Sequence, residues 1–214
     1  MIDHDYPAKL TLLELEKHLV NSYLALKPRL AASMAEVVFD QAIVRVLTTI
    51  RNSLYLARRG YVFETAMVAR GALEQIAWAR GASRAASEDE LFKIDIHKEI
   101  TFMKSIYPNC GKLYGELSRY YHFDAKLHNL FYAAKDGEIA VRMADRGTKF
   151  MAMHWPFKLS DVLVVVFEEF YRDRLSVLRG LTRQGVLRKI RFPMAHMKKY
   201  FSGVSDAELE QLFS

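Results

Sequence analysis

Arg70 and Glu74 are the first pair of residues in this sequence whose types and spacing could do chemistry. They lie four positions apart within a strongly apolar stretch, so on a helix they share one face and can form an ion pair. Two interpretations are open at this point. The pair either fixes helix register inside the core, or Arg70 presents its guanidinium group to a bound anion.

A second polar group follows between residues 117 and 129. Ser118 and His122 are one helical turn apart, and an imidazole can act as a general base near neutral pH. His122, Asp124 and His128 lack the spacing of a known metal site, and no HExxH motif is present, so we predict no metal. The structural alternative is a hydrogen-bonded histidine at a helix end. The predicted catalytic group consists of His122, Arg70, Glu74 and Ser118.

Residues 172–199 form a basic segment. Nine Lys or Arg residues stand there against one acid, Asp173, which gives a net charge of +8, whereas the whole chain carries +6. Such an excess suits a phosphate backbone or an acidic partner, although a solvated basic face is the simpler alternative. The predicted nucleic-acid-binding residues are Arg183, Arg188, Lys189, Arg191 and His196.

The order of these motifs resembles a family of uncharacterised bacterial all-helical proteins. The matched positions are Arg70, Glu74, Leu117, Ser118 and His122, and the resemblance spans about residues 35–180. In overall shape that family is similar to HEPN domains, which are frequent in toxin–antitoxin and phage-defence systems. HEPN proteins often use an Arg-x4–6-His motif as a metal-independent ribonuclease.

The chain contains one segment with that spacing, from Arg191 to His196. The chemistry would suit RNA, because arginine stabilises charge on the phosphate while histidine moves a proton to or from the ribose 2′-hydroxyl. The segment departs from the family pattern in two ways. Phe192 stands where a polar residue is usual, and Pro193 interrupts the helix that should carry both residues.

Composition limits the other classes of function. The chain has 214 residues, of which 51% are hydrophobic, so we expect one globular domain over residues 1–214. Cys110 is the only cysteine, which excludes an internal disulfide and, with nine Met, fits a reducing cytoplasm. We expect no signal peptide and no membrane span, because the longest apolar run covers only residues 162–167. No Walker loop, GxGxxG, GxSxG or CxxC motif occurs, so no cofactor is predicted.

Apolar periodicity predicts the elements that must position these residues. The fold class is all-α, a bundle of six or seven helices with one short β-hairpin insert and a flexible arm at residues 1–9. An Asp136–Gly137 turn would close the hairpin, and residues 154–156 should be irregular. The predicted helices cover residues 12–26, 30–59, 61–80, 87–106, 112–123, 161–180 and a short stretch after Ser205. Ser87 with Glu90, and later Ser160, are the expected helix caps.

Two functions from different classes fit these observations. The first is a protein directed at nucleic acid, in its sharpest form a metal-independent ribonuclease of toxin or phage-defence type. The second is a non-enzymatic oligomeric or regulatory module with a structural ion pair in its core. The basic segment favours the first, a homo-oligomer such as a homodimer is expected in both, and no motif decides whether the protein is an enzyme.

The basic segment makes the first prediction. If it binds nucleic acid, log affinity should fall linearly with log salt, with a slope of roughly −0.7 per phosphate contact for a single strand. Neutralising Arg183, Arg188 and Lys189 together should flatten that slope in a fluorescence-anisotropy titration. Salt-independent binding, or no binding at low salt, would contradict the assignment.

Overall fold

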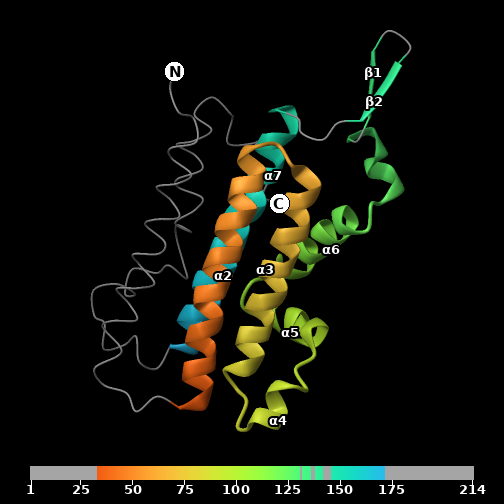
Figure 1. Cartoon of the computed structure of the whole chain (residues 1–214). Helices are drawn as coiled ribbons and strands as arrows, with labels where there is room; N and C mark the ends of the chain where they lie inside the picture. The colour runs from red at the N-terminus through yellow and green to blue at the C-terminus, as the bar shows by residue number, and fades with distance from the viewer. Residues whose placement is uncertain (1–32, 131, 136–137, 142–145, 172–214) are drawn as a thin grey trace, which may run out of the picture.

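A computed structural model describes residues 33–130, 132–135, 138–141 and 146–171 (Figure 1). Six α-helices lie within these ranges, which confirms the all-α prediction. Helix α3 contacts all five others and is the centre of the fold. Helices α2 and α3 stand side by side with α7 behind them, and α5 and α6 lie on the other side of α3 (Figure 1). Their bounds are α2 Met34–Arg58, α3 Val62–Ala82, α4 Glu88–Leu91, α5 Ile96–Met103, α6 Cys110–Tyr121 and α7 Arg146–Phe170.

Helix α2 has well-defined signals at both ends. At its start, the Ser33 side chain accepts from the Glu36 amide at 3.3 Å, and the Glu36 carboxylate accepts from the Ser33 amide at 2.7 Å. At its end, Gly60 takes a φ of 80°, a left-handed conformation that glycine adopts without steric cost. The Tyr61 amide then donates to the Leu56 carbonyl at 3.2 Å. This tight reversal sends α3 back along α2.

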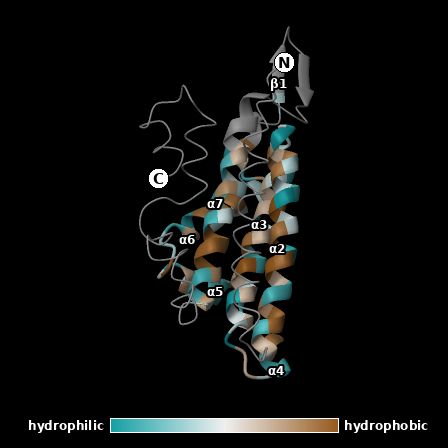
Figure 2. Ribbon diagram, turned by 90° about the vertical axis from the view of Figure 1, so that its left-hand side faces the viewer, coloured by the Kyte–Doolittle hydropathy of each residue, from teal (hydrophilic) through white to brown (hydrophobic). Residues whose placement is uncertain are grey.

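The core forms where α2, α3 and α7 meet. Alanines recur along α3 and are fully buried, so the neighbouring helices approach it closely. Leu73 and Ile76 on α3, and Trp155 and Leu163 on α7, are also completely buried. In Figure 2, hydrophobic segments concentrate along α3 and α7, whereas hydrophilic ones recur along α2. Within the described ranges, no helix is both long and apolar enough to cross a membrane.

A buried ion network fixes α3 against α5 and α7. The Arg80 guanidinium donates twice to the Glu169 carboxylate, at 2.9 and 3.2 Å, and once to Glu99 at 3.1 Å. Arg84, just beyond α3, donates to the same Glu99 at 2.6 Å. Because Arg80 and Glu99 are both buried, the charges are satisfied by each other rather than by water.

The structure divides the helix predicted over residues 87–106. Ser87 makes no side-chain cap, and Glu90 accepts instead from the Ala86 amide at 2.7 Å, so α4 is a single turn. The Asp95 side chain then accepts from the amides of His97 and Lys98 at 3.0 and 3.1 Å. A strong N-cap at Asp95 therefore starts the separate helix α5, and the prediction of one continuous helix was wrong.

Helix α7 also differs from its prediction. Residues 154–156, expected to be irregular, lie inside a continuous helix that runs through Pro156. Ser160, the expected cap, donates instead to the Pro156 carbonyl at 2.8 Å. Proline removes one backbone hydrogen bond, but Trp155 and Leu159 are completely buried around it. Burial of these large side chains outweighs the missing bond.

Two short strands follow α6. Strand β1, Tyr132–Lys135, pairs antiparallel with β2, Glu138–Val141, and Tyr132 lies opposite Val141. The Asp136–Gly137 turn lies outside the described residues, so the hairpin insert as a whole stays a prediction. The arm, the first and last predicted helices and the basic segment at 172–199 also lie outside them.

The ion network generates a stability prediction. Arg80→Ala should lower the free energy of unfolding by about 3–5 kcal/mol, because it leaves Glu169 without the guanidinium that pairs with it and takes one of two arginines from the buried Glu99. Lys98→Ala is the control, since its side chain is 75% exposed and 4.0 Å from Asp95, and it should cost less than about 1 kcal/mol. Urea denaturation measures both. Equal midpoints for the two variants would show that the network does not stabilise the fold.

Candidate functional site

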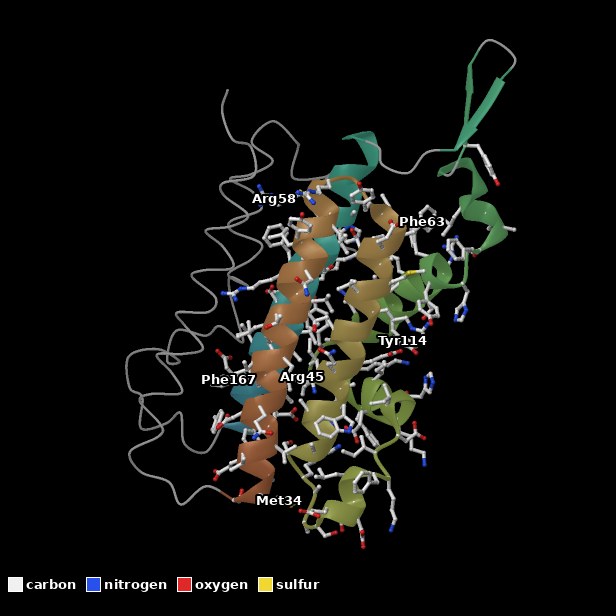
Figure 3. The ribbon with its side chains drawn as sticks, viewed as in Figure 1. Met34, Arg45, Arg58, Phe63, Tyr114 and Phe167 are labelled. Atoms are coloured by element: carbon white, nitrogen blue, oxygen red, sulfur yellow. The ribbon has the colours of Figure 1, made fainter. Side chains whose placement is uncertain are left out.

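Arg70 is the centre of a polar cluster between α3 and α6. Its Nε donates to Glu74 Oε1 at 3.1 Å, its Nη2 donates to the Tyr114 hydroxyl at 3.0 Å, and its Nη1 lies 3.4 Å from His122 Nε2. Figure 3 shows Tyr114 on the side of α3 away from α2. The structure thus brings together three of the four predicted catalytic residues, Arg70, Glu74 and His122, and adds Tyr114. Arg70 and His122 are 52 positions apart in the chain.

Hydrogen-bond donors and acceptors fix the roles in this cluster. The Tyr114 hydroxyl donates to Glu74 Oε1 at 3.1 Å while accepting from Arg70, which closes a triangle. A guanidinium can only donate, so the contact with His122 requires a neutral imidazole whose Nε2 accepts. Arg70 carries five N–H donors, and its three contacts leave two of them for a ligand.

The Arg70–Glu74 pair lies at the edge of the core. The Arg70 side chain is 16% exposed and the Glu74 side chain 35% exposed, so the location inside the core suggested by the apolar helix was wrong. Burial lowers the pKa of Arg70, but the Tyr114 hydrogen bond and the Glu74 charge outweigh it, and the pKa is raised. The ring of Tyr121 covers the guanidinium carbon at 4.3 Å from its centroid. Arg70 is therefore a permanent cation within reach of solvent.

The end of α6 places His122 through an unusual backbone conformation. Phe123 has a φ of 50°, in the left-handed region that glycine usually occupies at this position. The Asp124 amide donates to the Arg119 carbonyl at 3.0 Å, which completes the same type of cap that Gly60 forms after α2. Stacking between Phe123 and Phe63, with ring centroids 5.6 Å apart, offsets part of the free-energy cost of this left-handed conformation. Strained residues often accompany functional sites, and this one follows directly after His122.

The other residues predicted near His122 have different roles. The Ser118 hydroxyl is buried and has no partner among the described residues, so it forms no side-chain hydrogen bond with His122. Asp124 accepts from the Lys126 amide at 3.0 Å and pairs with Arg119 at 2.9 Å, and these two contacts lower its pKa. The side chain of His128 lies outside the described structure. In the part of the chain that is described, no three His, Cys, Asp or Glu side chains could hold a metal ion.

The predicted nucleic-acid-binding residues all lie in the basic segment, outside the described residues. They are Arg183, Arg188, Lys189, Arg191 and His196. The structure therefore does not place His196 relative to Arg70 and His122.

A second polar cluster joins α6 to α7. Glu116 Oε1 accepts from Trp155 Nε1 at 2.9 Å and lies 3.1 Å from His154 Nε2. Burial raises the pKa of Glu116, but the His154 and Trp155 contacts and the charge of Lys158 outweigh it and hold the pKa at about 2. Glu116 is one turn away from Tyr120 and lies between Tyr114 and His122 on α6. This contact therefore fixes the helix that carries half of the Arg70 cluster.

Tyr114 and Tyr121 are members of the site that sequence reasoning missed. Tyr114, Ser118 and His122 recur at intervals of four along α6, so a helical projection of the sequence would have placed Tyr114 on the histidine's face. Tyr121 carries no comparable signal. Its contact with Arg70 depends on how α6 packs against α3.

Comparison with known proteins adds no assignment. No protein-family model, no curated protein and no solved structure matches the chain.

The Glu116 cluster generates a prediction for acid stability. Glu116 has an ordinary pKa of 4.5 and a pKa of about 2 in the folded protein. A lowered folded-state pKa stabilises the protein fully above pH 4.5, and the contribution is lost as pH falls from about 4.5 towards 2. It amounts to at most about 3 kcal/mol, at 1.36 kcal/mol per pKa unit.

Glu116→Gln removes this titration and keeps an oxygen that can accept from Trp155. Thermal melts between pH 7 and pH 2.5 should show the variant less stable than wild type at neutral pH, with the difference shrinking below pH 4.5. A stability difference between wild type and variant that stays constant across this pH range would contradict the role of the Glu116 charge.

Proposed function

We propose that this protein binds single-stranded RNA at the Arg70 cluster and cleaves it as a metal-independent ribonuclease of toxin or phage-defence type. The observation that carries the proposal is the 3.4 Å contact between Arg70 Nη1 and His122 Nε2. It joins a permanent cation to a neutral imidazole at a partly exposed position. These are the two groups that phosphodiester transfer to a 2′-hydroxyl requires when no metal takes part.

The two groups have separate roles in the reaction. The free N–H donors of Arg70 bind the non-bridging phosphate oxygens and stabilise the charge that builds up on them. When Arg70 Nη1 moves from His122 Nε2 to the phosphate, the lone pair of Nε2 is free to take the proton of the ribose 2′-hydroxyl, whose oxygen attacks phosphorus. The bond to the 5′-oxygen breaks, that oxygen leaves with a proton from water, and a 2′,3′-cyclic phosphate forms. His122 then gives its proton to the hydroxide that remains, which restores the neutral imidazole. Glu74 and Tyr114 hold Arg70 in position and are positioning residues.

Exposed aromatic side chains near the cluster favour a single strand over a duplex. Tyr121 is 44% exposed and Phe123 49% exposed, and both flank His122 at the end of α6. Unpaired bases stack on such rings, whereas bases inside a duplex are not accessible. Lys126 is exposed on the same part of the chain and supplies positive charge for the RNA backbone, whereas Arg119 is paired with Asp124.

The sequence-based expectations agree with this proposal. The basic segment at 172–199 would add phosphate contacts, and the resemblance to HEPN domains supports a ribonuclease. A protein of that class would act in the cytoplasm as a homodimer, which is compatible with a single cysteine at position 110.

The alternative is a non-enzymatic interaction module, and one observation favours it. Glu74 Oε1 accepts from both Arg70 and Tyr114, so the three side chains form a closed triangle that joins α3 to α6. In that reading Arg70 is structural, and His122 serves as the C-cap of α6.

A cleavage assay separates the two functions. A labelled single-stranded RNA with excess EDTA should be cut by the wild-type protein. His122→Gln keeps an acceptor for Arg70 but cannot take a proton, so cleavage should slow by about 100-fold or more, with the melting temperature and RNA affinity preserved. His97→Gln is the matched control, because His97 touches the edge of Tyr114 without contacting Arg70, and its rate should stay within about twofold.

Other outcomes of this assay assign the alternative. RNA binding without cleavage by the wild-type protein would support an RNA-binding module. Cleavage by His122→Gln at the wild-type rate would remove His122 from the reaction.

A further inference from the structure

A groove at the junction of α2 and α3 is separate from the Arg70 cluster. Its volume is about 410 Å³, within the range of roughly 300–1,000 Å³ typical of small-molecule sites. Figure 3 shows Arg45 at this junction. The floor is apolar and the rim polar, and the lining residues are Val38, Gln41, Ala42, Arg45, Gln75 and Trp78.

Arg45 supplies an unpaired positive charge at the rim. Its side chain is exposed, and within the described part of the chain its guanidinium has no carboxylate or hydrogen-bond acceptor as a partner. Arg70 and Arg80 on the neighbouring helix are both held by glutamates. Because Arg45 has no such partner, an anionic group can bind it without first displacing a carboxylate.

Trp78 supplies a flat aromatic surface in the same groove. It packs against the core but is only partly buried, so part of its indole ring lines the groove. The other tryptophan, Trp155, is completely buried and donates its N–H to Glu116. An indole that is fixed by core packing and open on one side suits stacking with a planar aromatic group.

Two glutamines complete the polar rim. Gln75 Oε1 accepts from the Thr49 hydroxyl at 2.9 Å, which fixes its amide and leaves the NH₂ group to donate. Gln41 is exposed on α2 and can both donate and accept. Amide side chains of this kind recognise the hydrogen-bonding edge of a nucleobase.

We propose that this groove binds a nucleotide, with the base stacked on Trp78 and the phosphate bound by Arg45. A free nucleotide and one residue of a nucleic-acid chain share this chemistry. The proposal does not depend on catalysis at His122, because among the described residues the groove side chains share no hydrogen bond or ion pair with the side chains of the Arg70 cluster.

Tryptophan fluorescence tests the proposal directly. Titration with AMP should quench the emission of Trp78 in a saturable way, while the buried Trp155 gives a constant background. Arg45→Gln should weaken AMP binding about tenfold or more and leave the binding of adenosine, which lacks the phosphate, unchanged. Arg51→Gln removes one charge from α2 outside the groove and is the matched control, with AMP affinity at the wild-type value.

Two further ligands identify the source of the nucleotide. Ribose 5-phosphate lacks a base and should cause no quenching. An adenylate hexamer that binds more than tenfold tighter than AMP would identify a nucleic-acid chain, and AMP binding at least as tightly would identify a free nucleotide.

The proposal is overturned if neither AMP nor the hexamer gives saturable quenching at millimolar concentration, or if Arg45→Gln binds AMP like wild type. Trp78→Phe, followed by calorimetry, should bind AMP more weakly than wild type. Because that change also touches the core, Arg45→Gln decides the result if Trp78→Phe does not fold. His122→Gln should bind AMP normally, which separates failure here from failure of the ribonuclease proposal.

Discussion

Helix α3 must satisfy two permanent cations while being surrounded by other helices. A guanidinium group keeps its charge in a protein, and burying it without a partner would cost several kcal/mol. Arg80 meets this constraint with carboxylates from α5 and α7, and Arg70 meets it with Glu74 and the hydroxyl of Tyr114 on α6. The charges of α3 therefore help to decide how the surrounding helices are placed, in addition to the apolar surface that they bury.

The two arginines are satisfied to different degrees, and the difference bears on function. Arg80 is buried and paired with two carboxylates, so its positive charge is neutralised inside the fold. Arg70 has a single carboxylate, which it shares with Tyr114, and a neutral imidazole as its third partner. The two N–H donors of Arg70 that these contacts leave free lie at the edge of the core, where a ligand can reach them.

Local sequence patterns predicted much of the fold. The features that they did not predict depend on contacts between helices that are far apart in the sequence. Apolar periodicity identified α2, α3 and α6, and spacing alone paired Arg70 with Glu74, because these features depend on neighbours within one helix. The contacts of Arg70 with Tyr114 and of Glu116 with Trp155 depend on how α6 packs against α3 and α7, which spacing within one helix does not determine. The prediction of an irregular segment around Pro156 was wrong for the same reason. Burial of apolar side chains against other helices keeps α7 continuous through this proline.

The left-handed conformation of Phe123 has a consequence for motion. A non-glycine residue there costs roughly 1–2 kcal/mol, and after the buried Tyr120 the rings of Tyr121 and Phe123 are exposed. Fraying of the last turn of α6 would carry Tyr121 and His122 away from Arg70 while Leu113 and Leu117 stay packed. Native-state hydrogen exchange would then find its lowest protection along α6 in that turn, and the two sides of the Arg70 cluster would separate far more often than the domain unfolds.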